Sequence, residues 1–366
     1  MFFLLSQAPA SNVLKSDVLK VKAKSIYLAD FDSLDVILDY HADEPMVPSS
    51  MTKIMTALVC FQALRDKKIS PDTTVTVPSY AYKTEGTTMF LNLNQVVSIE
   101  DLLRGLICVS GNDAAKTLAI ALEGSEEAFA VKMTEMAKKI GATHTNFENA
   151  SGLPSTKHQT TARDLFKISH YLISHFKKEY QLFKEKSFCF NQITQYNKNT
   201  LLNHSSFDGI KTGFTQLGKY GMVASRVDPI SKRRLILVIN GLSSERERAE
   251  EAKRLLQWGF RQTKNIYFFQ AGQTVAQRPV RFGDKRMIDL VTYRSVCVTV
   301  EADEKEKPTC DVFFNAPYIK GPLPKGSVVG KVIVKTKWGR KVYDLRTKEE
   351  IKQASLLWKI IDSFKF

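Results

Sequence analysis

The spacing of apolar residues predicts a mixture of helices and strands along most of the chain. After Ser50, apolar side chains recur at helical spacing, at Ile54, Ala57, Leu58 and Phe61. Helices are expected at residues 50–65, 99–108, 112–122, 124–140, 161–178 and 245–262, and strands at 25–30, 35–40, 209–215, 220–226 and 235–240. This mixture predicts an α/β (α+β) domain in which helices pack around an antiparallel sheet.

The pattern changes near residues 262–266, where we place a domain boundary. The later part holds short strand-like runs separated by Gly, Pro and charged turns, at residues 267–269, 286–293, 296–300, 310–314 and 328–335. A chain of 366 residues is long enough for two domains. We therefore expect a small all-β C-terminal domain over residues 265–345.

The last segment, residues 346–366, changes character once more. Its apolar residues follow helical spacing, at Ile351, Ala354, Leu357, Trp358, Ile361 and Phe364. Lys352 and Lys359 project from the opposite side of such a helix. A terminal amphipathic helix of this kind either lies in a membrane interface or docks on its own domain, and both readings remain open.

The first ten residues, MFFLLSQAPA, combine a short apolar block with a small-residue end. That is typical of the tail of a signal peptide, although the basic n-region is missing, and an exposed apolar tail is the alternative. Elsewhere the chain has no run of about 18 or more apolar residues, so no transmembrane helix is predicted.

Charge and composition narrow the possible partners. A formal net charge of +15 attracts polyanions, which include nucleic acid, anionic lipid and anionic wall polymers. The basic residues are scattered, and neither a zinc-finger spacing nor an RNA-binding signature is present, so nucleic-acid binding is not expected. The five cysteines form no C-x-x-C pair and the six histidines form no H-E-x-x-H motif, so neither a metal nor an organic cofactor is predicted.

A serine and a lysine three residues apart open the helix predicted at 50–65. Ser50 and Lys53 would share one helix face, so that the amine and the hydroxyl can meet. A serine hydroxyl is a poor nucleophile until a base takes its proton, and a lysine is such a base only when its pKa is lowered. A second S-x-x-K, Ser174 to Lys177, lies in an ordinary amphipathic helix, so this pattern alone carries little weight.

The segment Ser110-Gly111-Asn112 links two of the predicted helices. Ser110 could relay a proton, and Asn112 could form a hydrogen bond with a substrate amide. Taken alone, the segment is equally typical of a helix cap.

The segment Lys211-Thr212-Gly213 lies in a predicted strand. The lysine and the threonine could receive a carboxylate, and the glycine would let a substrate lie along the strand edge. An exposed edge strand without any function is the plain alternative.

In this order the three motifs resemble those of serine β-lactamases and penicillin-binding proteins. The likeness to the D-alanyl-D-alanine carboxypeptidases extends to the residues around the motifs, at 48–56, 103–115, 162–164, 208–215 and 258–260. Proteins of that family consist of a signal peptide, a catalytic domain, a β-rich pedestal and a C-terminal amphipathic anchor. The resemblance implies these parts at residues 1–10, 11–264, 265–345 and 346–366, with a β-lactamase/transpeptidase-like fold in the catalytic domain.

The resemblance also implies a role for each motif residue. Ser50 would attack the carbonyl of the penultimate D-alanine with Lys53 as the base, and Asn112 would belong to the same catalytic group. Ser110 and Lys211 would pass the proton to the leaving D-alanine. No cofactor is implied.

The remaining implied roles concern substrate binding. The N–H groups of Ser50 and Phe214 would form the oxyanion hole. Thr212, Gly213, Thr215 and an arginine would hold the peptide and its terminal carboxylate, with Arg248 as the first candidate arginine and Arg163 as the second. The implied partners are peptidoglycan stem peptides, β-lactam antibiotics as covalent inhibitors, and an anionic membrane at the periplasmic face.

Other functions remain possible from the sequence. A D,D-endopeptidase acting on cross-links could carry the same three motifs. A class A β-lactamase usually has S-D-N in place of Ser110-Gly111-Asn112 and lacks a pedestal. A non-catalytic wall-binding protein would not need all of the motif side chains.

Overall fold

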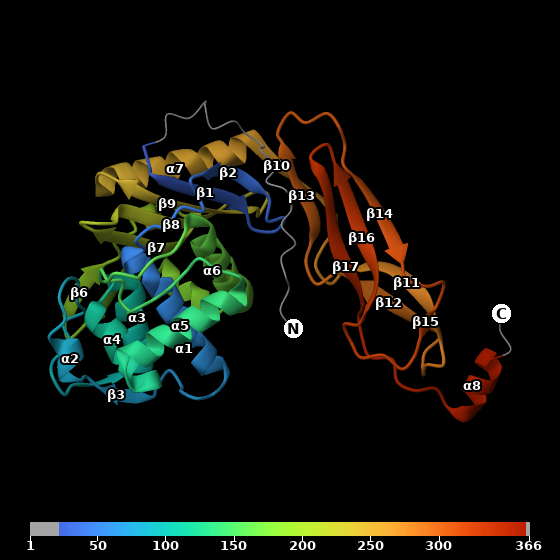
Figure 1. The fold of residues 1–366 in the computed structure, drawn as a ribbon, viewed down its shortest axis with the longest axis horizontal. Coiled ribbons are helices and arrows are strands. Elements are labelled where there is room, and N and C mark those ends of the chain that lie inside the picture. The colour runs from blue at the N-terminus through green and yellow to red at the C-terminus, as the bar shows by residue number, and fades with distance from the viewer. Residues whose placement is uncertain (1–21, 364–366) are drawn as a thin grey trace. The chain divides into compact units, whose positions relative to one another are not determined.

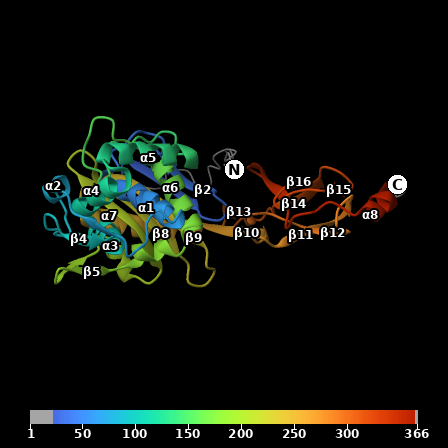
Figure 2. The same ribbon diagram turned by 90° about the horizontal axis from the view of Figure 1, so that it is seen from below.

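The computed structural model describes residues 22–363, apart from the side chain of Ile361. Within this range the chain forms two compact units that divide between Phe260 and Arg261, and residues 32–35 belong with the second unit. Figures 1 and 2 show the helices and the five-stranded sheet of the first unit and the strands of the second. The signal-peptide remnant expected at residues 1–10 lies outside the described residues.

The first unit is built on one antiparallel sheet with strand order β2-β1-β9-β8-β7. Its strands are β1 (Ser25–Asp30), β2 (Val36–Tyr40), β7 (Phe207–Thr215), β8 (Lys219–Val227) and β9 (Arg234–Leu242). Leu235, Leu237 and Ile239 of β9 belong to the core cluster that also contains residues of α7 (Glu245–Gln262). Alternate residues of a strand point to opposite faces, so Ile236 and Val238 are buried on the other side, where α6 (Ala162–His175) packs. Figure 1 shows α7 on one face of the sheet and α1, α5 and α6 on the other.

The rest of this unit includes five further α-helices and two small hairpins. The helices are α1 (Lys53–Arg65), α2 (Ser79–Tyr82), α3 (Ile99–Arg104), α4 (Asn112–Glu123) and α5 (Glu126–Ile140). Two small hairpins pair β3 (Thr74–Thr76) with β4 (Val96–Ser98), and β5 (Ser187–Phe190) with β6 (Ile193–Tyr196). Ser98, Ser125 and Thr161 cap α3, α5 and α6 by accepting a backbone N–H with their side-chain oxygens.

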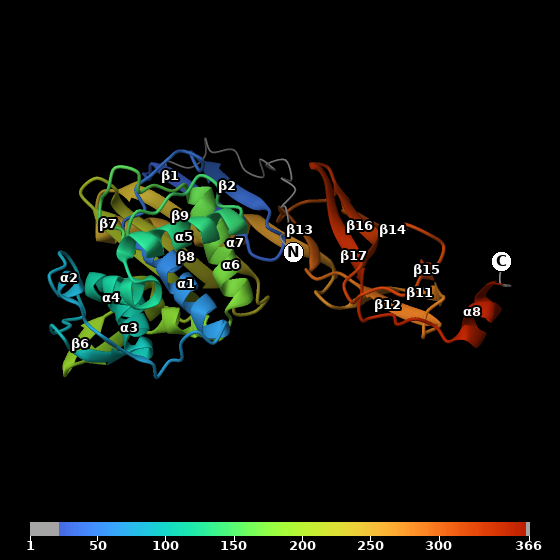
Figure 3. The ribbon, with the colours of Figure 1, turned by 60° about the horizontal axis from the view of Figure 1, so that its bottom comes forward.

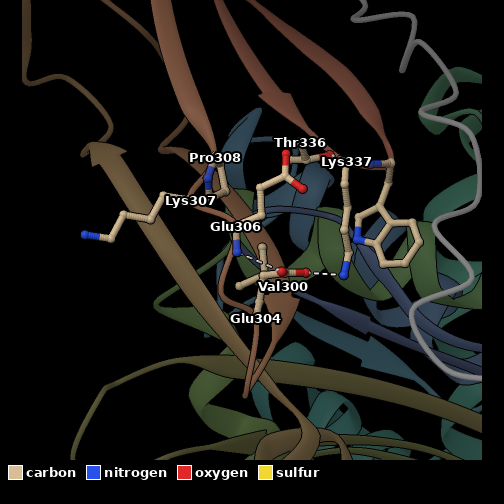
Figure 4. A pocket seen from close by; sticks show the side chains of 8 residues that line it. Val300, Glu304, Glu306, Lys307, Pro308, Thr336 and Lys337 are labelled. Atoms are coloured by element: carbon tan, nitrogen blue, oxygen red, sulfur yellow. Dashed lines mark hydrogen bonds and ion pairs between the residues drawn. The ribbon is translucent and has the colours of Figure 1, made fainter.

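The second unit is all-β apart from one short helix. A six-stranded sheet has the order β14-β16-β17-β12-β11-β15, and β10 pairs with β13. The strands are β10 (Thr263–Phe269), β11 (Thr274–Arg281), β12 (Met287–Val291), β13 (Val296–Glu301), β14 (Thr309–Phe314), β15 (Ile319–Lys320), β16 (Val328–Thr336) and β17 (Gly339–Thr347). Valine, isoleucine and leucine side chains from both sheets form a single core. A small surface hollow of this unit, shown in Figure 4, is bridged by the ion pair of Glu304 with Lys337 and carries no nucleophile–base pair.

The predicted mixture of helices around an antiparallel sheet, followed by an all-β domain, is confirmed. The hairpin β5–β6 and the strands β11 and β17 were not expected. β11 contains Pro279, which lowers the strand signal. β17 begins with Gly339 followed by the charged residues Arg340 and Lys341, a start that is typical of a turn.

The helix expected over residues 346–366 is much shorter than predicted. In the structure α8 spans Leu356–Ser363, and the preceding stretch is extended. Ile351 exchanges two backbone hydrogen bonds with Leu323 and is buried in the core of the second unit, and Ala354 donates its N–H to Phe282. These two apolar residues are spaced as in a helix, but in the structure they lie in extended chain and form backbone hydrogen bonds with other segments of the second unit. Phe364 lies outside the described residues. Among the residues that the structure describes, no helix is both long and apolar enough to cross a membrane.

Candidate active site

Ser50 and Lys53 meet at the start of α1, as the sequence predicted. Ser50 lies in a 3₁₀ turn, η2 (Ser49–Thr52), which leads directly into α1. The Nζ of Lys53 lies 3.2 Å from the Oγ of Ser50, 2.7 Å from the Oδ1 of Asn112 and 2.6 Å from the carbonyl oxygen of Ser151. Three oxygens from three separate segments therefore fix the position of one amine.

The Lys53 amine is fully buried. Burial holds the pKa of Lys53 well below its usual range, because the charged form loses its hydration, and the positive charge of Lys211 lowers it further. Asp113 acts in the opposite direction but does not cancel these effects. Burial thus shifts this amine toward its neutral form beside the Ser50 hydroxyl.

The loop at residues 149–152 supplies the carbonyl that holds Lys53. The side-chain oxygen of Asn149 accepts hydrogen bonds from the backbone N–H groups of Ser151 and Gly152, at 3.3 and 2.7 Å. Gly152 has φ of +85°, and a Cβ there would lie 1.8 Å from the carbonyl oxygen of Ser49. Only glycine lets this loop approach the nucleophile turn so closely.

The second motif lies between two helices. A π-helical turn, η3 (Gly105–Val109), follows α3 and ends at Ser110, which adopts a left-handed conformation with φ of +72°. Asn112 begins α4, and its Nδ2 donates to the carbonyl of Glu85 at 2.7 Å while its Oδ1 faces Lys53. The carbonyl of Thr87 accepts the Asn112 backbone N–H at 2.7 Å. Both the Ser110 and the Asn112 side chains are buried in this turn.

The third motif lies on β7, as predicted. Lys211 and Thr212 are buried, and the Oγ1 of Thr215 lies 2.9 Å from the Oγ of Ser49. A Cβ on Gly213 would lie 3.0 Å from the carbonyl oxygen of Pro48, so this glycine lets β7 pack against the nucleophile turn. Burial, followed by the charge of Arg248, lowers the pKa of Lys211 to about 7.

Arg248, on α7, lies close enough to β7 for its charge to act on Lys211. Its Nη2 donates to the carbonyl of Lys198 at 3.3 Å, and its Nε is buried without a hydrogen-bond partner among the described residues. The centre of the Tyr220 ring lies 5.9 Å from the Arg248 guanidinium and 4.3 Å from the centre of the Phe214 ring. Lys198, Lys211 and Arg248 therefore place three basic side chains at one end of the site, which suits an anion.

Arg163 is not brought to this cluster. It lies in the first turn of α6, where its Nε donates to Asp43 at 2.7 Å and its Nη2 donates to Asp39 at 2.6 Å. The guanidinium also lies 4.8 Å from the centre of the Tyr27 ring. Because two carboxylates already take its donors, we do not retain Arg163 as a substrate-binding residue.

Sequence reasoning missed the Ser151 carbonyl, Lys198 and Tyr220. Ser151 acts through its backbone carbonyl, which every residue type has, so the sequence gives no signal for it. Lys198 and Tyr220 lie in segments without a recognised motif. Within the described part of the chain, no group of three or more His, Cys, Asp or Glu side chains is placed to hold a metal ion.

Comparison with known proteins gives matches along most of the chain. A family model described as D-alanyl-D-alanine carboxypeptidase matches residues 11–243, and one described as penicillin-binding protein 5, C-terminal domain, matches residues 263–353. Over 320 residues the chain is 37% identical to D-alanyl-D-alanine carboxypeptidase DacC of Escherichia coli K12, covering 85% of this chain and 80% of that protein.

Solved structures give the same result for the fold. Penicillin-binding protein 5 from Haemophilus influenzae is 31% identical, with a TM-score of 0.80 over 92% of this chain and 99% of its own. Penicillin-binding protein D2 from Listeria monocytogenes, in its ampicillin-bound form, is 25% identical, with a TM-score of 0.61 over 66% of this chain and 98% of its own. The chain therefore belongs to the D-alanyl-D-alanine carboxypeptidase family of serine hydrolases.

Proposed function

We propose that the chain removes the terminal D-alanine from cell-wall peptides that end in D-alanyl-D-alanine, through an acyl-enzyme on Ser50. We assign Ser50 as the nucleophile and Lys53 as its base mainly because the buried Lys53 amine lies 3.2 Å from the Ser50 hydroxyl oxygen. A neutral lysine can take the serine proton, whereas a protonated one cannot.

The contacts of Lys53 support its role as the base. A neutral amine has two N–H groups and one lone pair. The oxygens of Asn112 and Ser151, at 2.7 and 2.6 Å, accept the two N–H groups, which leaves the lone pair for the Ser50 hydroxyl proton. Asn112 and the 149–152 loop thereby orient the base, and Ser50 attacks the carbonyl of the penultimate D-alanine.

The cationic end of the site supports recognition of a free carboxylate. Thr212 and Thr215 lie on β7, the charge of Arg248 lowers the pKa of Lys211 on the same strand, and the buried Nε of Arg248 has a donor to offer. A peptide without a free C-terminus would leave these donors unpaired, which favours a carboxypeptidase.

The remaining steps complete one turnover. Lys211, in its protonated form, gives a proton to the nitrogen of the leaving D-alanine. The proton that Lys53 took from Ser50 then passes through Ser110 to Lys211, and the N–H groups of Ser50 and Phe214 bind the developing oxyanion. Water then hydrolyses the ester on Ser50. A β-lactam places its ring carbonyl and its carboxylate at the same points, so we propose that β-lactams acylate Ser50.

The test is release of D-alanine from an acylated peptide ending in D-alanyl-D-alanine. We expect the wild type to release D-alanine, and Ser50→Ala, of unchanged thermal stability, to release none and to bind no fluorescent penicillin. Release by Ser50→Ala would refute the assigned nucleophile. Cleavage of cross-linked dimers without release from the peptide would show an endopeptidase instead.

We further propose that residues 11–264 form the catalytic domain, that residues 265–345 form a pedestal, and that α8 attaches the protein to the periplasmic face of an anionic membrane. Three apolar side chains of α8 are largely exposed, Leu356 at 77%, Leu357 at 68% and Ile360 at 50%. Asp362 and Arg286 form an ion pair of 2.6 Å, which ties the helix to the second unit. An amphipathic helix held in this way can lie in a lipid interface.

A liposome sedimentation assay tests this attachment. We expect a variant with serine at positions 356, 357 and 360 to leave anionic liposomes while it still releases D-alanine. A control with serine in place of the half-exposed Phe313 should bind liposomes like the wild type. Equal sedimentation of the triple variant and the control would refute the anchor.

A further inference from the structure

A buried histidine outside the three motifs lies against the nucleophile turn. His158 is 2% exposed and belongs to the segment that joins α5 to α6, two helices that pack against α1 (Figure 3). Within this segment the backbones of Asn146 and Gln159 exchange two hydrogen bonds, at 2.9 and 3.0 Å. This bridge brings the two ends of the 146–159 stretch together, so that the ring of His158 meets the backbone of Glu148.

Both nitrogens of the His158 ring take part in hydrogen bonds. The backbone N–H of Glu148 donates to Nδ1 at 3.0 Å, and Nε2 lies 2.8 Å from the Oγ1 of Thr52. Because a backbone N–H can only donate, Nδ1 carries no proton, so the ring proton lies on Nε2 and is donated to Thr52. A doubly protonated ring would place an N–H group against the N–H of Glu148. The contacts therefore require a neutral ring in one tautomer.

Burial favours the same neutral form of the ring. It lowers the pKa of His158 to about 4, because the charged ring would lose its hydration. The carboxylate of Glu148 opposes this shift, and the charge of Lys53 adds to it. At neutral pH the ring thus stays neutral and keeps both of its contacts.

The two partners of His158 adjoin the groups that fix the base. Thr52 directly precedes Lys53 at the start of α1. Glu148 lies three residues before Ser151, whose carbonyl oxygen is 2.6 Å from the Lys53 amine. His158 therefore connects the two segments between which the hydrogen bond from Lys53 to Ser151 forms.

We infer that His158 is a positioning residue for acylation. It joins the nucleophile turn to the 149–152 loop and thereby keeps the Lys53 amine beside the Ser50 hydroxyl. This inference rests on the proposed nucleophile and base. Without the imidazole the two segments separate and water reaches the amine. A hydrated amine is protonated more readily, so the pKa of Lys53 rises and less of the base is neutral at a given pH.

The test measures the rate of acylation by fluorescent penicillin as a function of pH, in His158→Ala and in the matched control His170→Ala. His170, on α6, has its Nε2 3.1 Å from the carbonyl oxygen of Phe31 and its ring against Phe166. We expect His158→Ala to acylate about 10- to 100-fold more slowly. Because the base must be neutral, the rate falls as pH falls through the pKa of Lys53, and this acid limb should move to higher pH in His158→Ala. In His170→Ala neither the rate nor the limb should change.

The other charges that act on Lys53 are the same in the wild type and in these variants. Lys211, Lys198, Asp113 and Glu126 are the charged groups that shift the pKa of Lys53, and all four remain in place. The ring that is removed is neutral. A moved acid limb therefore reports a change in the burial of the Lys53 amine, which a loss of stability alone does not produce.

Two further variants show whether His158 acts through Thr52. His158→Gln keeps an amide N–H that can donate to the Thr52 hydroxyl, and it should restore most of the acylation rate. Thr52→Val keeps the shape of the side chain but removes the hydroxyl, so it should slow acylation and move the acid limb as His158→Ala does. In the double variant the two losses should not multiply, because both remove the same contact. If His158→Ala does not fold, Thr52→Val and His158→Gln provide the same comparison.

Each other outcome has a definite meaning. A wild-type rate in His158→Ala, or a slower rate with an unmoved acid limb, would show that the histidine has only a structural role. Losses that multiply in the double variant would show that His158 does not act through Thr52. Each of these results refutes the inference and leaves the proposed function intact. A wild type that penicillin does not acylate would refute the proposed function, and the inference with it.

Discussion

The substitution Gly152→Ala tests whether the 149–152 loop keeps Lys53 in place. With φ of +85° at this position, an alanine costs about 1–2 kcal/mol in conformational energy. Its Cβ would also lie 1.8 Å from the Ser49 carbonyl oxygen and 2.8 Å from the Thr52 Oγ1. An ordinary contact is wider by more than 1 Å, so the backbone of the loop or of the nucleophile turn must move, at a further cost of about 1–3 kcal/mol.

This movement separates the Ser151 carbonyl, the Lys53 amine and the Ser50 hydroxyl. Misplacement of reacting groups by about 1 Å can reduce a rate roughly 100-fold. We therefore expect Gly152→Ala to acylate with fluorescent penicillin on the order of 100-fold more slowly. The free energy of unfolding in urea should fall by about 2–5 kcal/mol.

The matched control is Gly141→Ala, at the end of α5. Gly141 has φ of +92°, but a Cβ there would meet nothing within 4 Å. The control should lose only the conformational cost of about 1–2 kcal/mol and keep the wild-type acylation rate. If Gly152→Ala acylates as fast as Gly141→Ala, the loop does not position the base.

Three further predictions concern the charged residues Lys211, Arg248 and Arg163. Because Lys211 has a pKa of about 7 and must be protonated to pass a proton to the leaving D-alanine, kcat/KM for D-alanine release should fall as pH rises through about 7. In Lys211→Arg the guanidinium does not give up its proton, so kcat/KM should fall at every pH and the residual activity should no longer show this limb near pH 7. Arg248→Ala should lower kcat/KM for peptides with a free C-terminus about 10- to 100-fold, because a charge-assisted hydrogen bond to the carboxylate is lost. Arg163→Ala should keep kcat/KM and lower the free energy of unfolding by about 1 kcal/mol, since its ion pairs are partly exposed.

The controls follow from the same contacts. An unchanged alkaline limb in Lys211→Arg would show that another group donates the proton. A loss of activity in Arg163→Ala equal to that in Arg248→Ala would restore Arg163 as a candidate for substrate binding.

The sequence alone was sufficient for the features that depend on local spacing. Ser50 and Lys53 are three residues apart at a helix start, and this distance along the chain determines that their side chains can meet. The unbroken apolar run from Leu235 to Ile239 likewise predicts a strand, and such a run is typical of a strand that is buried on both faces. The order of the three motifs then indicated the family, with its reaction.

Only the tertiary structure decided which distant groups complete the site. The sequence ranked Arg248 ahead of Arg163, but both lie in the first turns of helices and the structure separates them by their neighbours: two carboxylates for Arg163, and Lys211 and Lys198 for Arg248. The sequence could not identify the Ser151 carbonyl, because every residue has one.

The C-terminal segment shows the same limit in the fold. Ile351 and Ala354 are spaced as in a helix, yet they lie in extended chain, because Leu323 and Phe282, far away in the sequence, offer backbone partners there. Local spacing determines which side chains share a face, whereas the partner of that face depends on contacts between distant parts of the chain.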